Sequence, residues 1–111
     1  MKSNQKNINQ LIKLEPIDND RLINLCGLLD KNIRQIEEFF NVEISNRGNS
    51  FKITGDNQNV AHTSTFIEKI YSLSENEEIT PKQLHLYLNN SNEFLSDTTG
   101  DDSKDKISLK K

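Results

Sequence analysis

The sequence predicts an α+β domain in which helices cover one face of a three-stranded sheet and an extra helix follows at the C-terminal end. Apolar and polar residues alternate in segments 8–15, 42–45 and 51–54, as they do in half-buried strands. Between and after these segments, apolar residues recur at helical spacing, which gives the order strand, helix, helix, strand, strand, helix. With 111 residues, 32% of them hydrophobic and none of them Trp, the chain has the size of one domain with a small core.

The first strand is expected in residues 8–15. Ile8, Ile12 and Leu14 share one face at period two. Pro16 ends the strand because it has no amide hydrogen to donate to a sheet. Residues 1–7 are polar and show no periodicity, so a disordered N-terminus is predicted there.

The first helix is expected to follow Asp18, a residue type whose carboxylate accepts hydrogen bonds from the first amides of a helix. Leu22, Leu25 and Cys26 form its buried side, with Cys26 interpreted as a small core residue rather than a reactive thiol. Gly27 ends this helix, as glycine commonly does just past a helical C-terminus.

A second helix is expected to begin at Asp30, which is interpreted as its N-cap rather than as a catalytic carboxylate. Ile33, Ile36 and Phe40 recur at helical spacing and form its buried stripe, with Phe39 as a further candidate.

Two strands and a tight turn follow the second helix. Val42 and Ile44 face the core from one strand, and Phe51 and Ile53 face it from the other. The turn is placed at residues 46–49, with Arg47 at its tip, because Asn and Gly tolerate the positive φ angles of hairpin turns.

A longer helix is expected over residues 57–73, and a capping box over residues 80–83 starts the last helix. The predicted domain therefore spans residues 8–93, and the Ser-, Thr-, Asp- and Lys-rich residues 94–111 are predicted to be a flexible linker. The predicted core consists of Leu22, Leu25, Ile33, Ile36, Phe40, Val42, Ile44, Phe51, Ile53, Val60, Ile67 and Ile70.

The sequence shows no catalytic, metal or nucleotide-binding pattern. No pair of glycines has the spacing of a phosphate-binding loop, and His62 and His85 have no second ligand at metal-site spacing. An enzyme, a metal site and a bound cofactor are therefore not expected in this chain. The absence of an apolar run of membrane-spanning length and of a signal-peptide pattern predicts a cytoplasmic protein without membrane contact. The net charge of −3 argues against strong non-specific binding to nucleic acid.

The segment Gly27-Leu28-Leu29-Asp30 resembles the Gly-x-x-Gly loop of KH domains, small α/β modules that often clamp single-stranded nucleic acid. In that loop the glycines let backbone amides approach phosphates, and basic residues occupy the middle positions. Here the middle positions are leucines and Asp30 replaces the second glycine, so RNA binding is expected to be micromolar at best. The residues that this resemblance implies for nucleic-acid contact are Gly27, Leu28, Leu29, Lys31, Arg34 and Arg47.

Longer segments also show a resemblance to a family. LEPIDNDRLINLCGLLDKNIRQIE and VEISNRGNSFKITG, followed by a helix ending near IYSL and by TPKQLHLYL, resemble the N-terminal region of PhoH-like proteins. In those phosphate-starvation-inducible bacterial cytoplasmic proteins, this region precedes a P-loop ATPase domain, and a role in RNA metabolism beside a YbeY-type endoribonuclease is expected. The resemblance implies that ATP and Mg²⁺ bind to the ATPase domain, which is absent from this chain.

Two functions stay open from the residues. The first is an RNA-binding accessory domain for the ATPase. The second is a degenerate KH fold that serves as a protein-interaction or oligomerisation module, including a homo-oligomer, in which exposed Leu28 and Leu29 contact another surface. The ordinary alternative for these two leucines is that one of them folds back onto the core. A basic groove around Gly27 would favour the first function, and an apolar patch there would favour the second.

Overall fold

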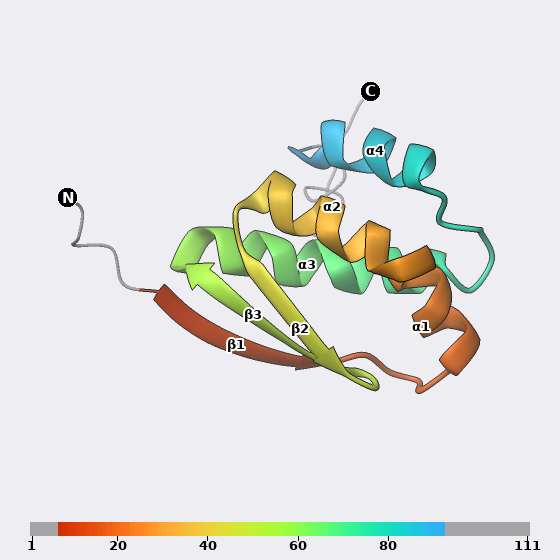
Figure 1. Cartoon of the computed structure of the whole chain (residues 1–111), viewed down its shortest axis with the longest axis horizontal. Coiled ribbons are helices and arrows are strands. Elements are labelled where there is room, and N and C mark those ends of the chain that lie inside the picture. The colour runs from red at the N-terminus through yellow and green to blue at the C-terminus, as the bar shows by residue number, and fades with distance from the viewer. Residues whose placement is uncertain (1–6, 93–111) are drawn as a thin grey trace, which may run out of the picture.

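The computed structural model describes residues 7–92, in which strands and helices follow one another in the predicted order (Figure 1). The elements are β1 (Asn7–Lys13), α1 (Asn19–Cys26), a 3₁₀ turn (Leu28–Asp30), α2 (Lys31–Phe40), β2 (Glu43–Arg47), β3 (Ser50–Asp56), α3 (Asn57–Leu73) and α4 (Pro81–Asn89). Asn7 belongs to the first strand, so the predicted disordered N-terminus is one residue too long there. Residues 1–6, and the predicted linker at 94–111, lie outside the described part of the chain.

The sheet has the order β1-β3-β2, with β3 antiparallel to both neighbours. β2 extends to Arg47, which lies opposite Ser50. The hairpin turn therefore consists of Gly48 and Asn49 alone, and Arg47 is the last residue of a strand rather than the tip of a four-residue turn. Gly48 has a φ of 58°, a backbone angle that glycine adopts without strain.

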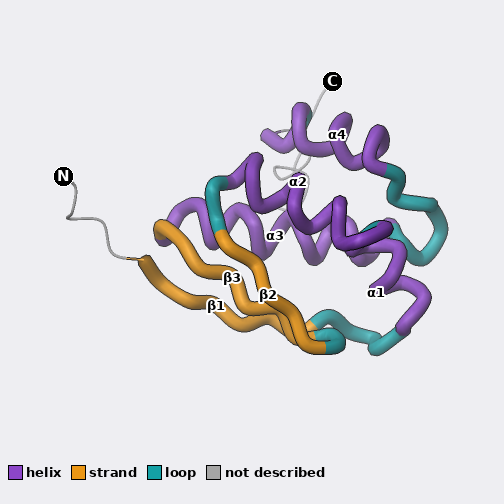
Figure 2. Tube along the Cα trace, in the orientation of Figure 1, coloured by secondary structure: helices purple, strands orange, loops and turns teal. Residues whose placement is uncertain are grey.

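The helices form a second layer on one face of the sheet (Figure 2). α3 packs directly against β1 and β3, while α1 and α2 pack against α3 and against each other. α4 packs against α2 on the side away from the sheet (Figure 1). No helix within residues 7–92 is long and apolar enough to cross a membrane.

The predicted N-termini of α1 and α4 are confirmed by their capping hydrogen bonds. The Asp18 carboxylate accepts from the amides of Asp20 at 3.0 Å and Arg21 at 3.3 Å. The Thr80 hydroxyl oxygen accepts from the amide of Gln83 at 3.1 Å. Both caps satisfy amides that the helix itself leaves without partners.

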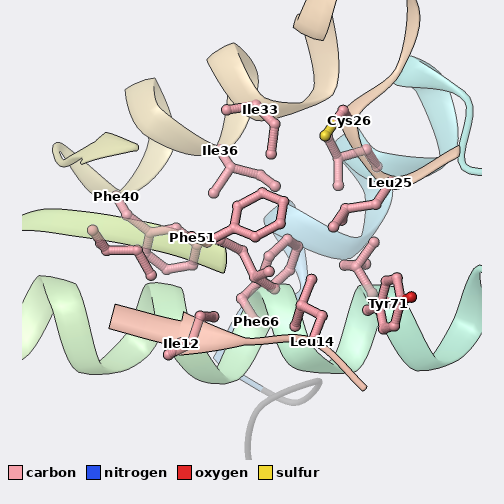
Figure 3. Close-up of a cluster of buried hydrophobic side chains, with 14 of the residues drawn as sticks. Ile12, Leu14, Leu25, Cys26, Ile33, Ile36, Phe40, Phe51, Phe66 and Tyr71 are labelled. Atoms are coloured by element: carbon pink, nitrogen blue, oxygen red, sulfur yellow. The ribbon is translucent and has the colours of Figure 1, made fainter. Parts of the chain in front are cut away.

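The core lies between the sheet and the helices (Figure 3). The predicted core residues are buried, except that Ile44 is half-buried because β2 is an edge strand. Phe39 is 47% exposed, so only its neighbour Phe40 belongs to the buried stripe of α2. Phe66 of α3 was not predicted to be buried, yet it is fully buried, and its ring centroid lies 5.5 Å from that of Phe40.

Asn24 of α1 fixes the connector between α3 and α4. Its side-chain amide donates to the carbonyls of Ser74 at 3.1 Å and Glu77 at 2.7 Å, and its side-chain oxygen accepts from the amide of Ile79 at 2.8 Å. One side chain thus satisfies three backbone groups of a loop, and Ile79 is held buried in the core.

Candidate nucleic-acid interface

The turn between α1 and α2 is compact and has an unusual backbone. Gly27 follows α1 with a φ of 81°, and Leu29 and Asp30 both adopt left-handed conformations, with φ of 54° and 60°. A hydrogen bond of 3.1 Å from the Asp30 amide to the Gly27 carbonyl closes the turn. Left-handed backbone costs a non-glycine residue roughly 1–2 kcal/mol, with Asp and Asn at the tolerant end, so Leu29 is the strained residue of the turn.

The predicted capping role of Asp30 is wrong. Asp30 precedes α2, but its side chain makes no capping hydrogen bond. An N-cap residue reaches the first amides of its helix from an extended backbone, and the left-handed φ of Asp30 does not provide that geometry. The carboxylate is exposed and contributes a negative charge to this end of the molecule.

Leu28 and Leu29 are 77% and 78% exposed, so neither side chain folds back onto the core. Ile23 on the last turns of α1 is also exposed, at 68%. The turn therefore carries apolar side chains in contact with solvent, as the interaction-module hypothesis requires.

Gly27 is required by the packing of the buried side chain of Asn32, a residue that was not predicted to be buried. A Cβ atom at Gly27 would lie 2.8 Å from the side-chain carbon and nitrogen of Asn32. Asn32 is fully buried, and its amide donates to the carbonyl of Ile79 at 2.7 Å. Its spacing to Ile36 and Phe40 places it on the buried stripe of α2, which is the signal that could have revealed it. The glycine of the predicted clamp loop thus has an internal reason to be glycine.

A groove of about 400 Å³ lies between α1, the turn and the β2–β3 hairpin. Its apolar wall comes from Leu22, Ile23 and Cys26. Its amide side chains come from Asn19 on α1 and from Asn46 on the hairpin. The residues that line it are Asn19, Leu22, Ile23, Cys26, Gly27, Asp30, Asn46 and Gly48. A nucleobase can meet apolar side chains on its faces and amide groups at its edges in such a groove.

The electrostatics of the groove are acidic rather than basic at the turn. Burial, with the Asp30 charge as the second cause, raises the pKa of the Cys26 thiol from 9.0 to about 11. Cys26 is therefore a protonated core residue at neutral pH, as predicted. Asp30 opposes the approach of a phosphate to the same end of the groove.

The six residues predicted to contact nucleic acid do not all lie in this groove. Gly27 lines it, and Leu28 and Leu29 lie on the adjoining turn. Lys31 and Arg34 are exposed on the first turns of α2 and are not among the lining residues. Arg47 borders a different hollow, together with Leu11, Ser45, Asn46, Ser50 and Lys52.

Arg21 does not add a positive charge to the groove, because it is held on α3. Its guanidinium lies 4.3 Å from the centroid of the Tyr71 ring and donates to the Tyr71 carbonyl at 2.9 Å. Among residues 7–92, no three His, Cys, Asp or Glu side chains are grouped as a metal site would require.

The order of the elements, the β1-β3-β2 sheet and the helices on one face define a KH-like fold, as predicted. No protein-family model matches the sequence. Three solved structures are similar to the chain. They are Dim2p from Pyrococcus horikoshii OT3, aDim2p in the a/eIF2alpha–aDim2p–rRNA complex from the same organism, and APE0754, a protein of unknown function from Aeropyrum pernix.

The similarity to these structures concerns the fold. The TM-scores are 0.59, 0.61 and 0.60 at sequence identities of 20%, 19% and 16%, in the same order. The alignments cover 76%, 83% and 83% of this chain, but only 49%, 50% and 50% of the other chains. The chain thus spans about half the length of the proteins that it matches.

Proposed function

We propose that this chain is an accessory domain that binds single-stranded RNA in the groove between α1, the turn at residues 27–30 and the β2–β3 hairpin. The groove is the observation that carries the proposal, because it borders the turn at residues 27–30, the position of the loop with which KH modules clamp single-stranded nucleic acid. The rRNA in the complex of the similar aDim2p structure supports the class of ligand.

The side chains of the groove suit bases better than phosphates. Ile23 and Leu22 give base faces an apolar wall, while Asn19 and Asn46 offer donors and acceptors to base edges. Phosphates then lie towards Lys31 and Arg34, outside the groove. With about two phosphate contacts, the affinity should fall only roughly 7-fold between about 50 mM and 200 mM salt.

The wider context rests on the sequence resemblance. We propose that the domain belongs to a PhoH-like ATP-binding protein and presents RNA to its P-loop ATPase domain, with a YbeY-type endoribonuclease as a partner. In that arrangement ATP and Mg²⁺ bind to the ATPase domain, and no residue of this chain holds them. The domain itself is proposed to carry no enzymatic activity and to act in the cytoplasm.

The experiment is a titration of labelled single-stranded RNA of about four nucleotides with the protein. Binding is measured by fluorescence anisotropy at two salt concentrations. Ile23→Glu places a charge in the apolar wall, whereas Ile17→Glu is a matched control because Ile17 is 65% exposed and does not line the groove. We expect Ile23→Glu to abolish detectable binding and Ile17→Glu to retain it. Equal affinities of the two variants would refute binding in the groove.

A second function is favoured by the two exposed leucines of the turn, Leu28 and Leu29, of which Leu29 has a strained backbone. A residue such as Leu29, which combines left-handed backbone with 78% exposure, is maintained more readily where a partner covers it. Leu29→Gly removes the apolar side chain and relieves the backbone, and Leu28→Ser removes the neighbouring one. If the domain is an oligomerisation module, the double variant will dissociate an assembly that light scattering detects in the wild type. A wild type that is monomeric at all concentrations would refute oligomerisation.

A further inference from the structure

The face of the sheet opposite the helices carries a group of basic side chains. Residues that alternate with the buried ones point to this face. In the row nearest the hairpin turn, Lys13 of β1 and Arg47 of β2 lie on either side of Ser50. In the next row, Leu11 and Ser45 flank Lys52. Three cations from three strands therefore occupy two adjacent rows, and we call Lys13, Arg47 and Lys52 the sheet-face cations.

The sheet-face cations are available to a ligand. All three residues are exposed, and no hydrogen bond or ion pair within residues 7–92 engages their side chains. A hollow of about 360 Å³ lies among Leu11, Ser45, Asn46, Arg47, Ser50 and Lys52. Leu11 is 62% exposed and provides an apolar surface beside the charges.

The charge changes sign along the sheet, which limits this surface. The next row contains Glu43 opposite Thr54, and a neighbouring hollow is lined by Glu37 and Glu43 as well as by Lys52. The positive end of the face is therefore the end at the hairpin, beside the groove.

Asn46 connects the two surfaces. It lines the groove together with α1 residues and also lines the hollow that contains Arg47 and Lys52. The hairpin thus has the groove on one side and the sheet-face cations on the other. A bound extended ligand that crosses the hairpin meets both surfaces.

We propose that the sheet-face cations bind the phosphodiester backbone of single-stranded RNA that extends beyond the groove, which deepens the proposed function and rests on it. Charge complementarity identifies the ligand, since three unpaired cations in a protein of net charge −3 suit a polyanion. No aromatic side chain lies in these two rows, so bases have no stacking platform here. The contacts are therefore to phosphates and do not depend on base sequence.

The test compares RNA of about four nucleotides, which fills the groove, with RNA of about twelve nucleotides, which reaches the sheet face. The variant is Lys13→Gln/Arg47→Gln/Lys52→Gln in the full chain. We expect the short RNA to bind this variant and the wild type equally. The variant should bind the long RNA more weakly than the wild type, and the ratio of the two affinities should shrink roughly 20-fold between about 50 mM and 200 mM salt, because three phosphate contacts contribute a salt slope near 2.

A matched pair of single variants controls for net charge. Lys52→Gln and Lys82→Gln remove the same charge from exposed positions, but Lys82 lies on α4, away from the sheet. Lys52→Gln should weaken binding of the long RNA, and Lys82→Gln should not. Thermal unfolding of each variant shows that the fold is intact.

The outcomes separate the two proposals. In one outcome, the short RNA binds the wild type but not Ile23→Glu, and the long RNA binds the triple variant as tightly as the wild type. That outcome overturns this inference and leaves the groove proposal standing. Long RNA that binds Ile23→Glu at full affinity overturns both, because the sheet face would then act without the groove. Absence of binding of either RNA to the wild type also overturns both.

Discussion

Replacing Asp30 by glycine should leave the domain as stable as the wild type or stabilise it by up to about 1 kcal/mol. Asp30 has φ 60° and ψ 25°, and its side chain caps nothing, so its removal costs no hydrogen bond. Glycine relieves the left-handed backbone, which costs other residues roughly 1–2 kcal/mol, although Asp lies at the lower end. The greater freedom of glycine in the unfolded chain offsets part of this gain, by about 0.4–1 kcal/mol. An N-cap would instead lose a few tenths of a kcal/mol on the same change.

A short series of variants at Asp30 distinguishes these explanations. Serine is as good an N-cap as aspartate but tolerates a left-handed backbone less well. Asp30→Ser should therefore lower the free energy of unfolding by about 1 kcal/mol. Asp30→Asn keeps the conformational tolerance and should change stability by less than about 0.5 kcal/mol. Urea unfolding followed by circular dichroism measures all three. A stable Asp30→Ser beside a destabilised Asp30→Gly would refute the backbone argument.

The same variants test the charge of Asp30 at the groove. A unit charge about 7 Å from a phosphate in water contributes roughly 0.6 kcal/mol of repulsion, which is about 3-fold in affinity. Asp30→Asn and Asp30→Gly should therefore both tighten RNA binding by this factor, measured by anisotropy at low salt. If RNA binding remains undetectable in both variants while the fold survives, the groove is vestigial and the interaction-module hypothesis replaces RNA binding.

Three further predictions concern the core and the turn. Ile36→Ala should cost about 2–5 kcal/mol in urea unfolding because Ile36 is fully buried, and an unchanged midpoint would contradict its place in the core. Gly27→Ala and Asn32→Ala should each destabilise the domain. The double variant should lose about 1 kcal/mol less than the sum of the single losses, because alanine at position 32 removes the atoms that would lie 2.8 Å from the new Cβ at position 27. Additive losses would show that the two positions do not meet. Burial raises the pKa of the Cys26 thiol from 9.0 to about 11, so the thiol ionises more easily in the unfolded chain than in the folded one. This contribution to the free energy of unfolding is complete below pH 9, and roughly 2–3 kcal/mol of it should be lost as the pH rises towards 11. Cys26→Ala should lack this alkaline loss, and identical pH profiles would exclude it.

Local patterns in the sequence were sufficient for the elements and most of the core. Hydrophobic periodicity located the strands and α3, and Asp18 and Thr80 act as the caps that their residue types indicate. Asp30 misled the same reasoning because capping depends on the backbone angles of the residue as well as on its side chain. Those angles are set by the turn at Gly27, and a pattern of residue types does not contain them.

The site depends on contacts between segments that are distant in sequence, and these were not predicted. Asn32 is buried because it meets the carbonyl of Ile79, a partner 47 residues away. The groove exists because the hairpin with Asn46 approaches α1. Lys13 and Lys52 could each be placed on the exposed face by alternation, but only the strand register brings them into adjacent rows. Arg47 was expected at the tip of the hairpin turn and is instead the last residue of β2, in the same row as Lys13.

The two proposed surfaces together would let an acidic domain bind RNA. If both proposals hold, the groove with Asp30 recognises bases but repels phosphates, whereas the sheet-face cations attract phosphates without reading bases. Affinity should then increase with RNA length rather than with any single contact, and an RNA too short to reach the sheet should bind only weakly. Weak binding is sufficient for an accessory domain, because tethering to a second RNA-binding module raises the effective concentration to the millimolar range. In such a protein the domain would select long single strands at moderate salt and release short ones.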